Sequence, residues 1–211
     1  MVSRMTGAKL HYLECTSEGE LTDEELQKGI NERTRLVAVA QVSNVLGCVN
    51  PIQKITEMAH RVGAVFAPVP QKFEAGTVNA AGAVGLAAAI RYLQEKGFDY
   101  IQKKELELTQ RAMEGLGALP YVHILGSKDP ANHTGIVSFT IDGVHPHDVS
   151  EILSSDGIDV RAGHHCAQPL LEYLGVRSST RASMMFYNTP EEIDALIESV
   201  STIRRRMCYG E

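Results

Sequence analysis

A short loop near the carboxyl end of the chain places one cysteine beside two histidines and one arginine. It reads Arg-Ala-Gly-His-His-Cys-Ala-Gln-Pro over residues 161–169. A cysteine is a useful nucleophile only where its thiolate is accessible, and the neighbouring Arg161, His164 and His165 favour that form. A single cysteine is more often a buried structural residue, but this polar setting argues against burial. The loop therefore predicts Cys166 as a nucleophile.

Metal binding is a second interpretation of the same loop. His164, His165 and Cys166 are all metal-ligand types, and His145 and His147 lie upstream. Adjacent side chains rarely converge on one ion, so we expect no metal site here. The four cysteines of the chain contain no Cys-x-x-Cys pair, which argues against a disulfide framework and against a cysteine-rich zinc site.

Composition narrows the class of protein. The chain has 211 residues, of which 44% are hydrophobic and 22% charged, with a net charge of -6. The only basic cluster, residues 204–206, lies where a helix is expected to end, and cations there complement the helix dipole. We therefore expect neither nucleic acid nor a membrane as a partner. The first eight residues lack the apolar core of a signal peptide, so we expect a cytoplasmic protein.

The amino-terminal portion predicts alternating strands and helices. Residues 9–14 and 36–42 are expected strands, the second buried on both faces of a parallel sheet because it is almost continuously apolar. Between them a helix over 21–30 begins with Thr22 as N-cap and Glu25 completing a capping box. Pro51 opens another helix, whose face carries Ile52, Ile55 and Ala59, and residues 63–66 complete a βαβ unit.

A helix rich in glycine and alanine is expected from residue 79 to 96, ending at Gly97. Its small residues permit close helix packing. A further helix follows over 99–116. Ligands of a parallel sheet bind at the carboxyl ends of its strands, which places residues 43–47 at a site.

After residue 118 the expected elements become short strands and helices, so we place a boundary between domains 1–118 and 119–211. Short strands are expected at 121–125, 135–141, 158–161 and 179–186, with a helix over 146–155. The last helix begins with Thr189 as N-cap, Pro190 at the first position and Glu192 at the third. Its buried stripe comprises Ile193, Leu196, Ile197, Val200 and Ile203.

Four motifs together resemble the Suf-type (group II) cysteine desulfurases and selenocysteine lyases of the class V aminotransferase group. They are residues 161–169, the Arg-Ala-Ser and Tyr-Asn runs within 181–188, Val-Ser-Asn-Val-Leu-Gly at 42–47, and Phe-Glu-Ala-Gly-Thr at 73–77. The resemblance implies an α/β chain: part of the large domain of the fold-type I pyridoxal-phosphate transferases as a βαβ remnant, then a small α+β domain. It also implies that sulfur is removed from cysteine, or selenium from selenocysteine, leaving alanine and a persulfide on the enzyme.

The resemblance also implies roles for particular residues. Cys166 would accept the sulfur, and Arg181 would bind the substrate carboxylate, a task suited to a planar fork of donors. Asn44 would lie near the ring oxygen of pyridoxal 5'-phosphate and near the substrate. Thr77 would reach across a homodimer to the cofactor phosphate of the partner. Taken singly, simpler interpretations are a surface ion pair for Arg181, an Asx turn for Asn44 and a helix cap for Thr77.

For Arg161 and His165 the resemblance implies only proximity to the substrate. It further implies a sulfur-acceptor protein as partner and a role in supplying sulfur for iron-sulfur cluster assembly.

The chain departs from the family where the cofactor should be held. The family lysine lies in a Ser/Gly-His-Lys context after a strand ending in Asp-Gly-Ala-Gln, whereas here residues 66–70 lead directly to the motif at 73–77. The Schiff-base lysine, the aspartate that pairs with the pyridine nitrogen and most phosphate contacts are expected to be absent, as is the amino-terminal part of the fold. No remaining lysine has the right context: Lys9, Lys28, Lys54, Lys72, Lys96, Lys103, Lys104 and Lys128.

We therefore expect a chain of cysteine desulfurase lineage that does not turn over cysteine. Two alternatives stay open. One is a cofactor-free carrier that accepts and passes on a persulfide at Cys166, and the other is a non-catalytic remnant that dimerises.

Overall fold

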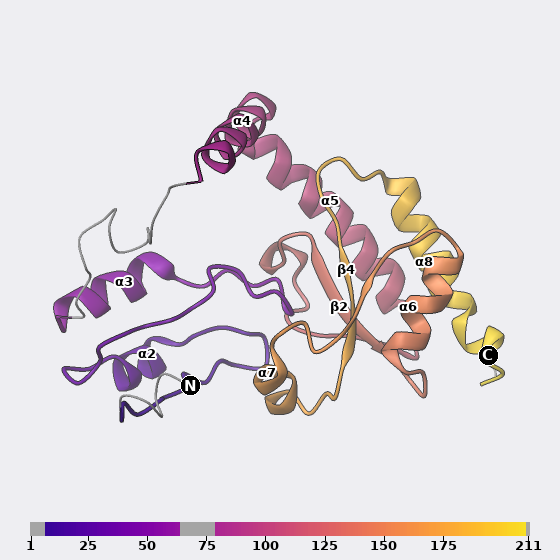
Figure 1. Ribbon diagram of the computed structural model, residues 1–211. Coiled ribbons are helices and arrows are strands. Elements are labelled where there is room, and N and C mark those ends of the chain that lie inside the picture. The colour runs from indigo at the N-terminus through magenta and orange to yellow at the C-terminus, as the bar shows by residue number, and fades with distance from the viewer. Residues whose placement is uncertain (1–6, 64–78, 210–211) are drawn as a thin grey trace. The chain divides into compact units, whose positions relative to one another are not determined.

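The computed structural model describes residues 7–63 and 79–209, which belong to two compact units (Figure 1). The first unit comprises Met1–Gln41 and Asn50–Asn79, and the second comprises Val42–Val49 and Ala80–Glu211. The boundary predicted near residue 118 falls inside the second unit. The predicted α/β fold class is confirmed, and the sheet is a small antiparallel one.

Within residues 7–63, the first unit contains the helices α2 (Asp23–Gly29) and α3 (Ile52–Arg61). Thr22 caps α2 as predicted, because its hydroxyl accepts a hydrogen bond from the Glu25 amide at 3.3 Å. The carboxylate of Glu25 accepts from the amide of Glu14 at 3.1 Å, which is a tertiary contact in place of the expected capping box. The unit's small core contains Leu26, Ile30 and Ile55.

Residues 9–14 and 36–42 form no extended strand, contrary to the prediction. Leu36 is 80% exposed, although its apolar run predicted burial on both faces. A parallel strand requires neighbours that satisfy its backbone and helices that cover its faces. The neighbour expected at residues 64–66 lies outside the described residues. Val42 makes one isolated antiparallel bridge with Val49, which closes a loop rather than a sheet.

The second unit is built on a sheet in the order β1-β2-β4-β3, with every pair antiparallel. Its strands are β1 (Val122–Ile124), β2 (Ile136–Ile141), β3 (Arg161–Gly163) and β4 (Ser179–Ser183). Three of them, β1, β2 and β4, were predicted in approximately these places. The strand predicted at 158–161 is displaced, because β3 begins at Arg161, where the predicted strand ends.

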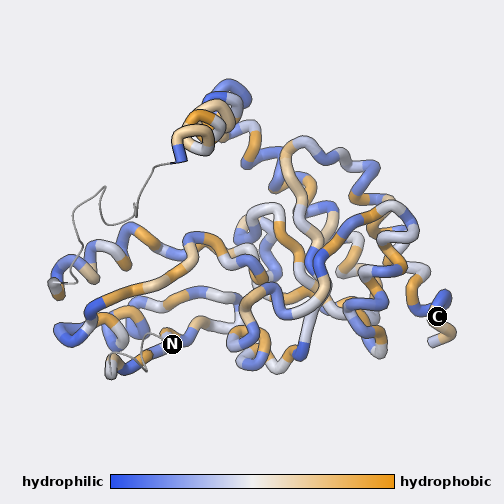
Figure 2. Tube along the Cα trace, viewed as in Figure 1, coloured by the Kyte–Doolittle hydropathy of each residue, from blue (hydrophilic) through white to orange (hydrophobic). Residues whose placement is uncertain are grey.

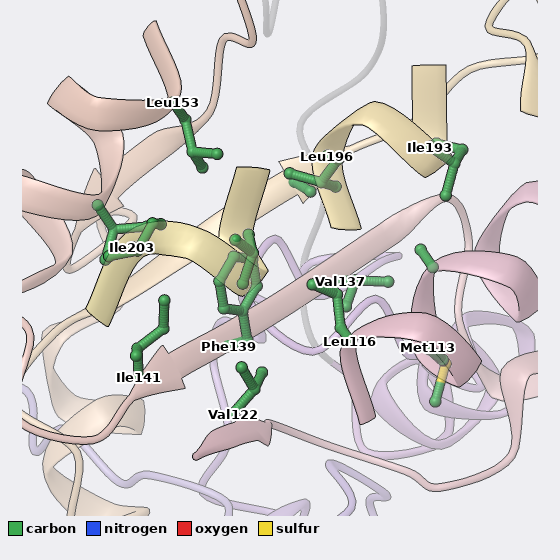
Figure 3. Packing of buried hydrophobic residues seen from close by; sticks show 14 of the residues in the cluster. Met113, Leu116, Val122, Val137, Phe139, Ile141, Leu153, Ile193, Leu196 and Ile203 are labelled. Carbon is green, nitrogen blue, oxygen red and sulfur yellow. The ribbon is translucent and has the colours of Figure 1, made fainter. Parts of the chain in front are cut away.

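One face of this sheet carries the main core (Figure 3). Val137, Phe139 and Ile141 of β2 are buried against three helices: α5 (Phe98–Gly117), α6 (Pro146–Ser155) and α8 (Pro190–Arg206). The period of two along β2 sends alternate side chains to this face. The predicted bounds of α6 are confirmed.

The start of α8 is set by its own sequence. Thr189 accepts from the amide of Glu192 at 3.3 Å, and the Glu192 carboxylate accepts from the amide of Thr189 at 3.0 Å. This reciprocal capping box was predicted and is confirmed. Four of the five predicted stripe residues are buried: Ile193, Leu196, Val200 and Ile203.

The glycine- and alanine-rich helix α4 (Ala80–Lys96) has the predicted bounds, but it buries none of its side chains. Figure 2 shows apolar residues along its middle turns, and Val84 and Leu86 are 68% and 63% exposed. The expected close packing is therefore not made within the described chain. Small side chains permit such packing but do not supply a partner. No helix among residues 7–63 and 79–209 is long and apolar enough to cross a membrane.

Two further elements were not predicted. The α-helix α7 (Gln168–Tyr173) follows the cysteine loop, and a single 3-10 turn, η1 (Pro130–Asn132), precedes β2. Both begin beside a proline, which suits the first turn of a helix.

Candidate functional site

The second face of the sheet is polar and carries the site. Ser138 of β2 lies opposite Arg181 of β4, and Arg181 lies opposite Arg161 of β3. Residues directly opposite in an antiparallel pair project to the same side of the sheet. The three side chains therefore share the face that is turned away from Phe139 and the helices.

A loop from a distant part of the sequence covers part of this polar face. Residues 42–49 are closed by a hydrogen bond from the amide of Ser43 to the carbonyl of Cys48 at 2.9 Å. The hydroxyl of Ser138 donates to the carbonyl of Val45 at 2.5 Å, and that of Thr134 donates to the carbonyl of Gly47 at 3.0 Å. Strand β2, through Ser138, and the segment just before it, through Thr134, thus hold the backbone of this loop by hydroxyl side chains.

Apolar contacts anchor the loop to α7. Val45 is fully buried and Leu46 is 2% exposed, and both belong to one cluster with Leu171 of α7. Burying a side chain of this size stabilises by about 1.5–3 kcal/mol. These contacts fix the position of the loop, and the exposed Asn44 directly precedes the two buried residues.

Asn44 joins the two other candidate residues. Its side-chain amide donates to the carbonyl of His165, 121 residues away in sequence. The backbone carbonyl of Asn44 accepts a hydrogen bond from Nη1 of Arg181 at 2.9 Å. The structure therefore brings together Asn44, the cysteine loop and Arg181, which the sequence singled out separately. An Asx turn, the simpler interpretation of Asn44, does not describe these long-range contacts.

Cys166 lies at the exposed point of a strained turn. His165 and Cys166 have φ angles of 52° and 58°, the left-handed region that side chains other than glycine rarely adopt. The turn is closed by the amide of Ala167 donating to the carbonyl of His164 at 2.9 Å. Two consecutive residues in this region cost on the order of 1–3 kcal/mol each. The Asn44 contact to the His165 carbonyl stabilises that conformation, and the thiol of Cys166 stays exposed.

Ser179 is a further residue of the candidate site, which the sequence did not predict. Nε2 of His165 lies 3.1 Å from the carbonyl of Ser179 and 3.0 Å from its hydroxyl. A carbonyl only accepts, so this pair favours a proton on Nε2. The only signal in the sequence was its position two residues before Arg181, which places both on the same face of a strand.

Burial lowers the pKa of His165, and the positive charge of Arg181 lowers it further. The hydrogen bond to the Ser179 carbonyl acts in the opposite direction but does not outweigh them. The ring is therefore neutral in the folded protein at neutral pH.

This shift predicts a pH dependence of stability. Because the folded state resists protonation of His165, the unfolded state binds more protons below about pH 6.5, the ordinary value for histidine. The contribution of the neutral ring is thus fully present above that pH and is lost as pH falls below it. Urea unfolding at pH 7.5 and 5.5 is expected to show a smaller loss of stability in His165→Gln than in the unmodified chain. An equal loss of stability in His165→Gln and in the unmodified chain would contradict the assignment. His164→Gln, at the exposed neighbouring position, is the control.

The two arginines differ in their surroundings. Arg161 is exposed, whereas Arg181 is partly buried, and its Nε has no hydrogen-bond partner among the described residues. Thr77, which the resemblance places at a partner's cofactor phosphate, lies outside the described residues, as does Lys72.

The residues that the structure describes do not fit pyridoxal phosphate bound as a Schiff base. A lysine with that role is desolvated in its pocket, but Lys9, Lys103 and Lys128 are exposed. The other described lysines have partners elsewhere, as follows: Lys28 with Glu25, Lys54 with Asp23, Lys104 with Glu107 and Lys96 over the ring of Tyr92. The amide of Asn44 is also engaged within the chain. In the described part of the chain there is likewise no cluster of three metal-ligating side chains.

Comparison with known proteins identifies the family. The model of the class-V aminotransferases matches residues 1–68 and 64–196. The chain belongs to the aminotransferase class-V family. Curated relatives of this chain include proteins named probable cysteine desulfurase. The protein of Halalkalibacterium halodurans is 37% identical over 94% of this chain and 65% of its own length, and that of Staphylococcus aureus strain Mu50 is 34% identical over 99% and 67%.

Solved structures agree with this assignment. The apo cysteine desulfurase of Thermococcus onnurineus NA1 has a TM-score of 0.87 and 29% identity, covering 97% of this chain and 68% of that one. The cysteine desulfurase CsdA of Escherichia coli, in an S-sulfonic acid form, has a TM-score of 0.84 and 25% identity, covering 97% and 68%. This class-V aminotransferase chain thus spans about two thirds of the length of its relatives.

Part of the difference in length is internal. The family model matches in two segments that meet at residues 64–68. The alignment with the H. halodurans protein extends over 268 residues, more than the 211 of this chain. The relatives therefore carry a segment that is missing here. This finding agrees with the predicted deletion next to the Phe-Glu-Ala-Gly-Thr motif.

Proposed function

We propose that this chain carries the sulfur-accepting half of a cysteine desulfurase site and does not by itself convert cysteine into alanine. In this proposal Cys166 accepts a sulfur atom as a persulfide, and Arg181 and Arg161 attract the negative group of the sulfur donor. Asn44 and His165 hold the loop that presents the thiol. The persulfide would then pass to an acceptor protein, as the resemblance to desulfurases of iron-sulfur cluster assembly implies.

One observation carries the proposal: Cys166 is exposed on a turn in a left-handed conformation that Asn44 stabilises from a distant segment. A cysteine with a purely structural role is normally buried and needs no such turn. Strained backbone of this kind concentrates at functional sites. Accepting sulfur needs only the nucleophile and its access, both of which the chain retains.

Conversion of cysteine is a different matter, because breaking its carbon-sulfur bond requires an electron sink at the α-carbon. Protein side chains do not supply one, whereas pyridoxal phosphate does. The resemblance implies this cofactor, but the lysines described above do not fit it. In this proposal the chain acts without pyridoxal phosphate, and conversion of cysteine belongs to the relatives, which are named probable cysteine desulfurases.

Treatment with dissolved elemental sulfur, an uncharged donor, tests the proposal. The thiolate of Cys166 is expected to open a sulfur-sulfur bond of the donor and to gain one or more sulfur atoms, seen by peptide mass spectrometry after alkylation. Cys166→Ser is expected to lose this gain entirely. Cys208 is an internal comparison because it is also exposed with a positive φ of 60° and follows three arginines in sequence, but no contact like that of Asn44 is made to its turn.

Equal sulfur loading of Cys166 and Cys208 would contradict the proposal, since exposure alone would then explain reactivity. Asn44→Ala separates the two explanations further. It leaves the thiol exposed but removes the donor to the His165 carbonyl, so we expect slower loading of Cys166 and unchanged loading of Cys208.

A homodimer stays a prediction from the resemblance. The exposed apolar side chains Val84 and Leu86 of α4 are compatible with a partner surface. Light scattering measures the molar mass directly, and a monomer would exclude the dimerising remnant.

A further inference from the structure

The two arginines of the site face each other without a counter-charge. Arg161 and Arg181 are direct neighbours across the β3–β4 pair. Like charges at such positions destabilise a sheet. Among the described residues neither forms an ion pair with a carboxylate, in contrast to Arg111 with Asp194 and Arg206 with Asp156. The pair is therefore a site that an anion would stabilise.

Arg181 adds a second sign of an absent ligand. Its Nη1 is engaged by the carbonyl of Asn44, but its Nε is buried without a partner in the described structure. Leaving such a donor unpaired costs about 1–3 kcal/mol, and more on a charged group. An oxyanion that accepted from this Nε would remove the cost. The fork of a guanidinium suits a group with several oxygens.

The chemistry available to Cys166 limits what this anion can be. With no electron sink to break a carbon-sulfur bond, the sulfur must arrive already bonded to a good leaving group. Thiosulfate is such a compound, since its outer sulfur is joined to a sulfonate that leaves as sulfite. The sulfonate oxygens would lie with the arginines while the outer sulfur met the thiol.

We propose that the Cys166 site takes a small anionic sulfane-sulfur donor of the thiosulfate type. The proposal rests on the sulfur-accepting function above and names its substrate class. The thiolate of Cys166 attacks the outer sulfur of thiosulfate, one sulfur-sulfur bond forms as another breaks, and sulfite departs with the electron pair. The products are a persulfide anion on Cys166 and sulfite, so charge and atoms balance without oxidant, reductant or cofactor.

The test compares thiosulfate with uncharged elemental sulfur on the whole chain. Sulfite release and the mass of the Cys166 peptide are followed together. Neutralising Arg161 in Arg161→Gln is expected to slow loading from thiosulfate roughly ten- to a hundredfold, the usual range for one charge-assisted hydrogen bond. Elemental sulfur has no charge to bind, so its loading reports any effect of Arg161 on the Cys166 thiolate alone, and the ratio of the thiosulfate rate to the elemental-sulfur rate is the readout expected to fall. Arg177→Gln, an equal charge change at an exposed position outside the pair, is the matched control.

Salt dependence gives a second measurement that needs no variant. Loading of the unmodified chain from thiosulfate should slow as ionic strength rises, whereas loading from elemental sulfur should not. Equal thiosulfate rates for the unmodified chain and Arg161→Gln, while elemental sulfur still loads Cys166, would overturn the donor class alone. Failure of both donors to load Cys166 would overturn the sulfur-accepting function as well.

Discussion

Incubation of the purified chain with cysteine and pyridoxal phosphate is expected to release alanine no faster than free pyridoxal phosphate does. Enzymes typically accelerate reactions at least about a millionfold, so loss of the cofactor site is the largest functional effect anticipated here. The physical reason is the segment that the relatives carry and this chain lacks, at the junction marked by residues 64–68. In addition, the described lysines are exposed or engaged elsewhere. Alanine is measured by chromatography against a protein-free control.

Borohydride reduction in the presence of pyridoxal phosphate, followed by peptide mapping, provides the independent readout. Scattered, substoichiometric labelling of exposed lysines would agree with the prediction. A single stoichiometric adduct together with rapid alanine release would contradict it. Lys72→Arg then decides whether Lys72, the lysine nearest the junction, is responsible.

Replacing Phe139 by alanine is expected to destabilise the chain by about 3–5 kcal/mol. Phe139 is fully buried on β2, between α5 and α8, so its removal leaves a cavity in the main core (Figure 3). Domains are typically stable by about 5–15 kcal/mol, so the loss would be a large share of the total. The measurement is the midpoint of urea unfolding followed by circular dichroism.

Phe98→Ala is the matched control, since the same side chain is 55% exposed at the start of α5. Its cost is expected to lie within about 0.5 kcal/mol. Similar losses in both variants would mean that the sheet and helices of the second unit do not pack as described.

Local signals in the sequence predicted the elements whose stability is decided within a few residues. The capping box of Thr189 and Glu192 places the start of α8, and Pro146 places the start of α6. Both have partners within one turn of the helix, so neighbouring sequence contains the whole interaction. The cysteine loop was also recognisable locally, because residues 161–169 contain the nucleophile and its polar neighbours together.

The strands expected at 9–14 and 36–42 were wrong for the converse reason. A strand is stabilised by partners elsewhere in the chain, and an apolar run such as 36–42 contains no information on whether they are present. Leu36 is exposed because no sheet in the described structure receives it. The close packing expected for α4 was not found for a similar reason. Small residues permit a helix contact but do not provide the opposite surface.

By itself, the sequence determined the family, the candidate nucleophile Cys166 and the absence of the segment that carries the cofactor lysine in the family. Each of these depends on runs of contiguous residues. Only the tertiary structure decided that Asn44 meets His165 and Arg181, over separations of 121 and 137 residues, and that Ser179 joins them. It also decided that Arg161 and Arg181 share one face. These facts depend on strand register and on the burial of Val45 and Leu46, which arise from packing of the whole unit rather than from any local pattern.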